Sequence, residues 1–321
     1  MIRTELTRMF GLKHPVILAP MGGVSGGALA AAVSNAGGLG LVGGGYGDPE
    51  WLHAELSRVS AATDRPWGMG LITWSIQPGV VELALRYRPA AVVLSFGDPR
   101  PHAAAIKKAG AKLICQVQDV AQARTALEAG ADLIVAEGNE AGGHSGARAT
   151  LPLVPAVVDE AAPVPVVAAG GIADGRGLAA ALMLGAQGAL IGTRFYASVE
   201  ALAPARIKAQ LVAGSGDDTA RTRVFDVVRG YDWPPHFPGR ALRNSFLERW
   251  NGREAELAAA LATERPAYQN AAQAADPDTA VVWAGEAIDL IKSIESAERL
   301  VQRISTEAEA QLDRAARLVA H

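Results

Sequence analysis

The stretch EGNEAGGHSG, residues 137–146, holds the residues best suited to acid–base chemistry. It contains four glycines, His144, Glu137 and Glu140, and it follows the apolar run ADLIVA at 131–136. A histidine with an ordinary pKa of about 6.5 can accept or donate a proton near neutral pH. Glycine allows left-handed backbone and the close approach of another molecule. We therefore predict a loop that places His144, as the catalytic residue, beside a bound ligand.

Eight short apolar runs recur along residues 15–193, most of them close to a glycine. Runs that are apolar throughout indicate strands buried on both faces, as in a parallel sheet. Between them lie segments of helical composition, several of which end in Ala-Gly or Leu-Gly, a C-terminal signal for a helix. Eight such units predict an α/β fold of the (β/α)8 TIM barrel class rather than an open sheet of about six strands. The runs are PVILAP (15–20), GLGLVG (38–43), WGMGLIT (67–73), AAVVLSF (90–96), AKLICQV (111–117), ADLIVA (131–136), PVVAAG (165–170) and GALIGT (188–193).

The second part of the chain departs from this alternation. We expect residues 1–200 to form the barrel and residues 201–321 to form a C-terminal loop and helical extension packed on it. The Pro- and aromatic-rich stretch GYDWPPHFPG (230–239) is typical of an irregular loop. Residues 286–320 carry apolar residues at spacings of three, four or seven, which predicts a helix with one apolar face. Because no heptad is sustained, we expect this helix to pack on the barrel rather than to form a coiled coil.

The composition argues against several kinds of partner and site. The net charge is −3 and no basic patch stands out, so we expect no nucleic-acid partner. No apolar run reaches the ~20 residues of a membrane helix, and the N-terminal segment lacks a signal-peptide core. We therefore expect a cytoplasmic protein without membrane contact. The single cysteine, Cys115, lies in an apolar run, which predicts a buried core residue and excludes an internal disulfide or a cysteine-based zinc site.

Glycines gather after the predicted strands, where a (β/α)8 barrel has its active site. Gly170 and Gly171 follow the seventh strand and precede a helix whose free N–H groups would favour a phosphate. Gly192 and Thr193 follow the eighth strand and add a backbone donor and a hydroxyl. These four residues predict a phosphate site. Because glycines elsewhere at the barrel mouth leave a flat surface, flavin mononucleotide (FMN) fits this pattern better than a sugar phosphate does.

Three segments resemble the nitronate monooxygenase family, formerly called 2-nitropropane dioxygenases. They are PVILAPMGGVSGGALAAAVSNAGGLGLVGGG (15–45), EAGGHSG (140–146) and VVAAGGIADGRGLAAALMLGAQGALIGTRF (166–195), and their order and spacing cover about residues 10–200. WAGEAIDLI (283–291) is similar to the family's final segment. The resemblance implies a barrel that binds FMN non-covalently, without a metal. It also implies oxidation of alkyl nitronates by O2 to a carbonyl compound and nitrite.

The resemblance further implies roles for individual residues. His144 would be the catalytic acid/base, which takes the α-proton of a neutral nitroalkane or, if cationic, stabilises the negative charge of a nitronate. The partners would be a small nitronate, or another small electron donor, and O2, and a homodimer stays open. Cofactor contacts would come from residues at several strand ends: Ala19, Pro20, Met21, Gly22, Gly70, Glu137, Gly142, Gly143, Gly170, Gly171, Ile191, Gly192 and Thr193.

Two of these positions depart from the family pattern. Gly70 stands on the third strand where the family often has Asn, and Glu137 stands where it often has Gln. An amide can donate a hydrogen bond to polar atoms of a flavin, whereas an ionised carboxylate cannot. Glu137 would therefore be protonated or bind the ribityl hydroxyls. The two departures indicate a divergent branch of the family and bear on the substrate more than on the cofactor.

Three other classes of function stay open at this point. NAD(P)H:quinone reductases and the flavin-type enoyl-acyl carrier protein reductases resemble the same scaffold, and EAGGH does not distinguish them from a nitronate monooxygenase. A non-flavin barrel, such as a sugar-phosphate isomerase or an aldolase, would also bind a phosphate. A catalytically idle FMN-binding or phosphate-binding protein is the third class. The presence of a bound flavin would separate the flavoenzymes from a non-flavin barrel. The compound that reduces the flavin would then separate a nitronate monooxygenase from the NAD(P)H-dependent reductases.

Overall fold

The computed structural model describes residues 1–318, and its central element is a parallel sheet of eight strands. Nearly every strand residue is buried, as expected for runs that are apolar throughout. The prediction of a (β/α)8 barrel is confirmed, and each strand falls within or overlaps one of the eight apolar runs. The strands are β1 (Val16–Leu18), β2 (Gly40–Gly43), β3 (Trp67–Ile72), β4 (Ala91–Ser95), β5 (Lys112–Val117), β6 (Leu133–Glu137), β8 (Val166–Ala169) and β9 (Ala189–Ile191).

The strands follow the chain order around the barrel. β1 pairs with β9, and the sheet continues through β8, β6, β5, β4 and β3 to β2. A parallel bridge between Ile17 and Leu39 joins β1 to the start of β2, and the Leu18 N–H donates to the Leu39 carbonyl at 3.0 Å. The ring of strands is thereby closed. All carboxyl ends of the strands meet at one rim, which is where βα loops can build a site.

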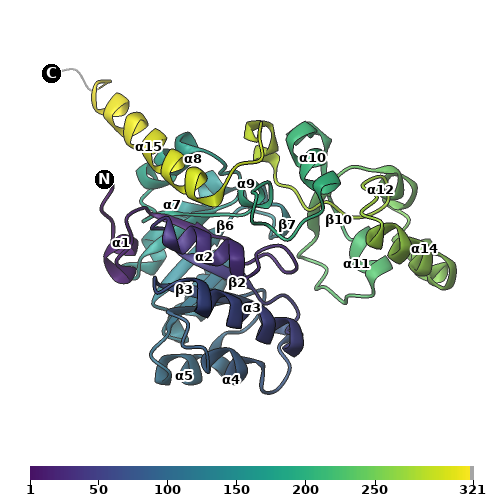
Figure 1. The fold of residues 1–321 in the computed structure, drawn as a ribbon, viewed down its shortest axis with the longest axis horizontal. Helices are drawn as coiled ribbons and strands as arrows, with labels where there is room; N and C mark the ends of the chain where they lie inside the picture. The colour runs from purple at the N-terminus through teal and green to yellow at the C-terminus, as the bar shows by residue number, and fades with distance from the viewer. Residues whose placement is uncertain (319–321) are drawn as a thin grey trace.

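Alternate strand positions divide the apolar side chains into two layers. Ile17, Val93 and Leu133 point into the barrel, where Leu6 and Phe10 of α1 (Glu5–Phe10) join them. The other strand residues pack against the surrounding helices (Figure 1). These helices are α2 (Gly27–Asn35), α3 (Pro49–Ala62), α4 (Val80–Leu85), α5 (Arg100–Lys108), α6 (Val120–Glu128), α7 (Thr150–Ala161), α8 (Gly175–Met183) and α9 (Thr193–Tyr196).

The extension contains strands as well as the expected helices and loop. β10 (Thr219–Thr222) pairs antiparallel with β11 (Gly239–Leu242), and β11 pairs in turn with β7 (Gly143–His144). His144 therefore lies in a short strand of a second sheet and not in a free loop, which the local sequence did not indicate. In Figure 1 the extension stands beside one side of the barrel. Its helices are α10 (Ala205–Ala213), α11 (Val224–Arg229), α12 (Ser245–Trp250), α13 (Glu254–Ala259) and α14 (Leu261–Gln273).

The last helix packs on the barrel, but it begins later than the prediction from residue 286. A 3-10 turn covers Glu286–Leu290, and α15 runs from Ala297 to Ala316. Ser296 caps α15, because its side chain accepts from the Arg299 N–H. Figure 1 shows α15 lying along α8, which it contacts extensively together with α2. Residues 319 and 320 of the predicted helix lie outside the described residues.

Two further expectations concern Cys115 and membrane contact. Cys115 is buried in the layer between the barrel and the helices, as predicted, and burial raises the pKa of its thiol to about 12. Within residues 1–318, no helix combines the length and the apolar character needed to cross a membrane. The same residues contain no cluster of three or more His, Cys, Asp or Glu side chains that could hold a metal ion.

The docking of α15 gives a first prediction. Ile304 is fully buried in the layer that α15 shares with α8, whereas Thr306 on the same helix is exposed. Ile304→Ala should lower the free energy of unfolding by about 2–5 kcal/mol, because it removes buried methyl groups and leaves a cavity. Thr306→Ala should change it by less than about 0.5 kcal/mol. Urea unfolding of both variants tests this, and equal effects would show that α15 is not part of the cooperative core.

Candidate active site

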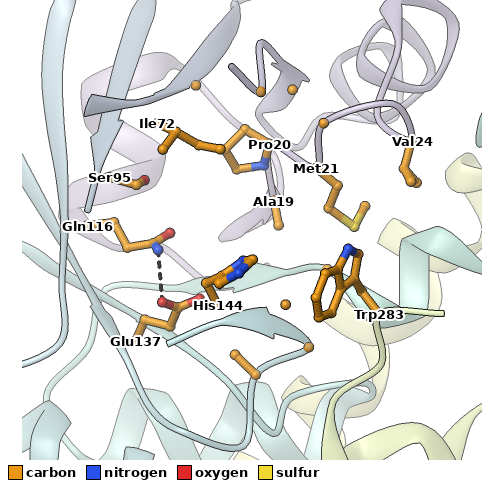
Figure 2. Close-up of a pocket in the computed structure, with 18 of the residues that line it drawn as sticks. Ala19, Pro20, Met21, Val24, Ile72, Ser95, Gln116, Glu137, His144 and Trp283 are labelled. Carbon is orange, nitrogen blue, oxygen red and sulfur yellow. Dashed lines mark hydrogen bonds between the residues drawn. The ribbon is translucent and has the colours of Figure 1, made fainter. Parts of the chain in front are cut away.

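A cavity of about 510 Å³ opens at the carboxyl rim of the barrel, and residues of the extension also line it. Figure 2 shows His144 between Glu137 and Trp283, with Ala19 and Pro20 on the facing wall. All but one of the residues predicted from the sequence line this cavity. They are Ala19, Pro20, Met21, Gly22, Gly70, Glu137, Gly142, Gly143, His144, Gly170, Gly171, Gly192 and Thr193.

Ile191 is the predicted contact residue that does not line the cavity. Its side chain is buried between the barrel and the helices, whereas Leu190 points toward the cavity. Successive side chains of a strand point to opposite faces, so only one of these two neighbours can face inward. The Ile191 carbonyl still acts at the rim, where it accepts a hydrogen bond from the Ala19 N–H at 2.9 Å.

Packing against Pro20 explains why position 70 is a glycine, which the resemblance to the family did not indicate. A Cβ atom at position 70 would lie 2.4 Å from Cγ of Pro20. The ring of Pro20 occupies this space, and Pro20 lines the cavity after β1. A side chain at position 70 would therefore displace Pro20. The absence of a polar side chain here makes the wall at Pro20 flat and apolar.

Gly142 allows the segment after β6 to approach the segment that precedes α15. A Cβ atom at position 142 would lie 2.6 Å from the Gly285 nitrogen and 2.9 Å from Oγ1 of Thr193. The Gly285 N–H donates to Oγ1 of Thr193 at 3.0 Å. The stretch WAGEAIDLI thus completes one wall of the cavity, to which Trp283 contributes its ring.

Backbone N–H groups at the ends of β8 and β9 form an anion-binding surface. The N–H groups of Gly171, Gly192 and Thr193 have no hydrogen-bond acceptor within residues 1–318. Gly170 and Gly171 both have left-handed backbone, with φ of 95° and 70°. Successive free N–H groups around such residues form concave nests that suit a phosphate.

We predicted that free N–H groups at the N-terminus of the next helix, α8, would bind the phosphate. This prediction is wrong, because these N–H groups already donate to carboxylates of the chain. The Gly175 N–H donates to Oε2 of Glu307 at 3.0 Å. Oδ1 of Asp174 accepts from the Arg176 N–H at 2.9 Å and from the Gly177 N–H. Two carboxylates therefore occupy the donors that the sequence analysis assigned to a phosphate. Glu307 belongs to α15, 132 residues further along the chain, so local sequence could not show this contact.

His144 is bound by a carboxylate from the extension. Its Nε2 lies 3.0 Å from both carboxylate oxygens of Asp226, which is on α11. Both side chains are almost fully buried. Because a carboxylate accepts hydrogen bonds, this contact places the proton on Nε2 and leaves Nδ1 as the acceptor nitrogen. Nδ1 has no partner among the described residues, and His144 lines the cavity.

Trp233 covers one face of the imidazole. The His144 and Trp233 rings stack with their centroids 3.5 Å apart and their planes 3° apart. Nε1 of Trp233 donates to the hydroxyl of Tyr46 at 2.8 Å. Trp233 comes from the loop 230–238, which is irregular as predicted. Tyr231 and Trp233 of this loop thus face the cavity.

The surroundings of His144 favour its neutral form. Burial lowers the pKa of His144, although the hydrogen bond to Asp226 and its negative charge act in the opposite direction. The net shift is downward, so at neutral pH the imidazole is uncharged and able to accept a proton. The geometry supports the role of a base and disfavours the cationic form that the sequence analysis also considered.

Glu137 is a buried carboxyl group held by two amides. Nε2 of Gln116 donates to its Oε2 at 2.8 Å, and Nε2 of Gln118 donates to the same oxygen at 3.1 Å. Burial raises the pKa of Glu137 to about 8, and the two amides and Arg221 only partly offset this effect. The group is therefore largely protonated at neutral pH. A protonated carboxyl can donate as well as accept, so Glu137 can contact a polar ring edge much as an amide would.

Glu140, by contrast, shapes the loop. Both of its carboxylate oxygens accept from the Thr150 N–H at 3.0 Å, and Oε2 also accepts from the Thr150 hydroxyl at 2.8 Å. This contact fixes the start of α7 to the segment after β6. Glu140 thus positions the backbone of Gly142 and Gly143 and leaves the chemistry to other residues.

These features fit a flavin nucleotide. The N–H groups at Gly171, Gly192 and Thr193 can hold a phosphate, and the glycines and Pro20 leave a flat wall for a planar ring. Glu137, Gln116 and His144 face the same cavity with polar atoms (Figure 2). The cavity is concave, mostly apolar and supplied with a few convergent polar groups, as in cofactor-binding sites generally.

The family model for nitronate monooxygenase matches residues 3–79 and 72–307. The fold is a (β/α)8 barrel, and the site is a cavity at its rim with a buried histidine. The chain belongs to the nitronate monooxygenase family, whose members are in general flavin-dependent, and it is an oxidoreductase.

Individual relatives carry different enzyme names. The chain is 37% identical over 252 residues to a Mycobacterium tuberculosis protein named (3aS,4S,5R,7aS)-5-hydroxy-7a-methyl-1-oxo-octahydro-1H-indene-4-carboxyl-CoA dehydrogenase, covering 77% of this chain and 68% of that protein. It is 34% identical to the nitronate monooxygenase of Neurospora crassa, covering 94% and 90%. The structure of FabK from Thermotoga maritima superposes with a TM-score of 0.88 at 31% identity, covering 99% and 100%. The family of the chain is therefore shown, but the names of its relatives indicate different substrates.

Several residues of the site escaped the sequence analysis. Asp226 lies 82 residues from His144, and nothing in its local sequence distinguishes it from other surface-type acids. Gln116 sits at the end of β5 and could have been found by counting inward-facing positions on that strand. Trp233 had a signal in the aromatic-rich stretch 230–239, which we interpreted only as a loop. Tertiary contact between β7 and the extension brings Asp226 and Trp233 to His144, whereas Gln116 on β5 contacts Glu137.

The Asp226 contact can be tested by titration. We expect an NMR pKa for His144 below 6.5, and a still lower one in Asp226→Asn, because the negative charge that favours the imidazolium is removed. The shift between the two proteins should be about one pKa unit or more. Asp232→Asn, in the loop that follows α11 and exposed, is the matched control and should leave the value unchanged. A raised pKa in Asp226→Asn would contradict the contact.

Glu137 gives a prediction about stability and pH. A carboxyl whose pKa is raised from 4.5 to about 8 on folding destabilises the folded state progressively as the pH rises between these values. Glu137→Gln removes this penalty. The unfolding free energy of the variant relative to the wild type should therefore increase from pH 5 to pH 8 by about 1 kcal/mol or more. Urea unfolding at both values tests this, and a pH-independent difference would show that Glu137 stays ionised.

Proposed function

We propose that this protein is a nitronate monooxygenase that binds FMN and oxidises nitroalkanes or their nitronates with O2 to a carbonyl compound and nitrite. The observation that carries the proposal is the open Nδ1 of a neutral His144 at the wall of the cavity. A base in this position can take the α-proton of a nitroalkane. Family membership and the match to the Neurospora crassa enzyme over 94% of the chain support the choice of reaction.

The residues of the chain have separate tasks in this proposal. FMN, when bound, supplies the acceptor for one electron from the nitronate. His144 accepts the proton on Nδ1, and Asp226 stabilises the imidazolium that results. Trp233 and Trp283 exclude water from this part of the cavity. Gly171, Gly192 and Thr193 would hold the FMN phosphate through their free N–H groups.

A second candidate is a reductase or dehydrogenase that uses a reduced or oxidised nicotinamide. The similarity to FabK over 99% of the chain, and to a protein named as a CoA-ester dehydrogenase, supports it. In this reading His144 would exchange a proton with a different substrate, and the cofactor site would be unchanged. A non-flavin barrel has less support, because the flat glycine-rich wall has no use in it.

The way in which the flavin is reduced separates the two candidates. The purified protein should show the visible absorption bands of oxidised flavin. Under anaerobic conditions, an alkyl nitronate should bleach these bands, whereas NADH and NADPH should not. Rapid bleaching by NADH or NADPH, with no effect of the nitronate, would exclude the monooxygenase and favour the reductase. Absence of any flavin from the protein and failure to bind added FMN would exclude both.

His144→Ala tests the proposed base. We expect flavin to stay bound and turnover of a neutral nitroalkane to fall at least tenfold, because the proton acceptor is lost. Turnover of the preformed nitronate should fall less, since its α-proton is already gone. His102→Ala, a histidine outside the cavity, is the control and should behave as the wild type. Equal losses for the nitroalkane and the nitronate would contradict the role of His144 as a base.

A further inference from the structure

Arg194 is a buried arginine that directly follows the residues assigned to the cofactor phosphate. It is 1% exposed and belongs to the short helix α9. Gly192 and Thr193, which precede it, line the cavity, whereas Arg194 does not. Its side chain therefore makes contacts within the protein and leaves the ligand space to its neighbours.

The guanidinium of Arg194 joins two segments that are far apart in the sequence. Its Nη2 donates to the carbonyl oxygen of Ala197 at 2.8 Å and to that of Ser293. Ala197 ends α9, whereas Ser293 lies 99 residues after Arg194, in the segment that leads into α15. One side chain thus bonds the end of α9 to the chain that returns from the extension.

Further hydrogen bonds join the same two segments before and after Arg194 in the sequence. The Gly285 N–H donates to Oγ1 of Thr193 at 3.0 Å. The Ala297 N–H, at the start of α15, donates to Oε2 of Glu200 at 3.0 Å. The segment from Gly285 to Ala297 is therefore bonded along its length to the residues that follow β9, and the contact of Arg194 lies between the two ends.

Stability alone does not explain a guanidinium at this position. Nε and Nη1 of Arg194 have no hydrogen-bond partner within residues 1–318. Burial lowers the pKa of Arg194 to about 10, Arg303 adds a like charge, and the attraction of Glu295 offsets these effects only in part. Glu295 is moreover shared, because Arg303 donates to its Oε1 at 2.6 Å. An apolar side chain of similar volume often fills such a place at no cost to stability.

The backbone that Arg194 fixes carries free N–H groups of the candidate phosphate site. The helix α9 spans only Thr193–Tyr196, and the Gly192 carbonyl accepts from the Phe195 N–H at 2.8 Å to begin it. A helix of this length is not stable through its own hydrogen bonds. The direction of the Gly192 and Thr193 N–H groups therefore depends on the contacts that anchor α9 from outside.

We propose that Arg194 is a positioning residue that holds the Gly192 and Thr193 N–H groups ready for a phosphate and couples phosphate binding to the docking of residues 284–297. The inference rests on the proposed function only for the identity of the phosphate, which is that of FMN. Binding and docking favour the same conformation of α9, so each stabilises the other by the same free energy.

A comparison of FMN with riboflavin tests the positioning role. The two ligands differ in the phosphate, so the ratio of their dissociation constants, riboflavin over FMN, measures the phosphate site alone. Arg194→Met removes both hydrogen bonds of Nη2, and the ratio should fall by about tenfold or more. Arg194→Lys keeps a donor and should retain part of the ratio. Arg206→Met, at an exposed position of α10, should leave it as in the wild type.

The affinity for riboflavin and the thermal unfolding of the ligand-free variants separate positioning from a general loss of structure. Arg194→Met should bind riboflavin within about twofold of the wild type, with a similar Tm, because the loss of a buried charge offsets the loss of two hydrogen bonds. An unchanged ratio in the folded variant would overturn the proposal. So would a parallel loss of riboflavin and FMN binding with a lowered Tm, since that is the result of a purely structural role.

Hydrogen exchange of the wild type keeps the proposal testable if Arg194→Met does not fold. Amide hydrogens of residues 284–297 should exchange about fivefold or more slowly with saturating FMN than with saturating riboflavin, because the phosphate stabilises the docked segment. The helices α13 and α14 are the internal control and should exchange equally with both ligands. Equal exchange of residues 284–297 with FMN and riboflavin would show that the phosphate and this segment are not coupled.

A protein that binds neither FMN nor riboflavin would contradict the proposed function, and inorganic phosphate then replaces FMN as the probe. Slower exchange of residues 284–297 with phosphate in the wild type, and loss of this effect in Arg194→Lys or Arg194→Met, would support the positioning role for another phosphate ligand. Absence of any effect of phosphate on the wild type would overturn it.

Discussion

The contact between His144 and Asp226 is the interaction on which the site depends. It joins a residue of the barrel to a residue of the extension through a nearly fully buried hydrogen bond, with both carboxylate oxygens 3.0 Å from Nε2. The pairing of β7 with β11 and the stacking of Trp233 on the imidazole come from the same part of the extension. The barrel alone would present His144 on a free segment, without a fixed tautomer or a shielded face.

The charges around the cavity are arranged so that the buried groups are neutral or matched. His144 is neutral because burial lowers its pKa, and Glu137 is largely protonated at neutral pH because burial raises its pKa to about 8. Glu140 is matched by the Thr150 N–H and hydroxyl. Arg229 is the exception within the described residues, since its charge has no acidic partner.

Family membership establishes the fold, whereas the substrate depends on the residues that line the cavity. The same backbone supports proteins named as a nitronate monooxygenase and as a CoA-ester dehydrogenase, at 34% and 37% identity to this chain. Gly70, which lies against Pro20, and Arg229, which lies beside Tyr231, are on the cavity wall that a substrate would meet. Function therefore has to be argued from these side chains and not from the barrel.

The sequence by itself determined the barrel, the glycine-rich rim and the position of His144 at that rim, because periodic apolar runs and glycines after strands are local signals. It could not determine the partner of His144, the cap of α8 or the start of α15. Asp226 and Glu307 reach their partners from 82 and 132 residues away. Ser296 starts α15 after a 3-10 turn whose apolar spacing resembled the helix itself. Only tertiary packing decides such contacts, because they depend on which surfaces meet and not on the pattern of either segment.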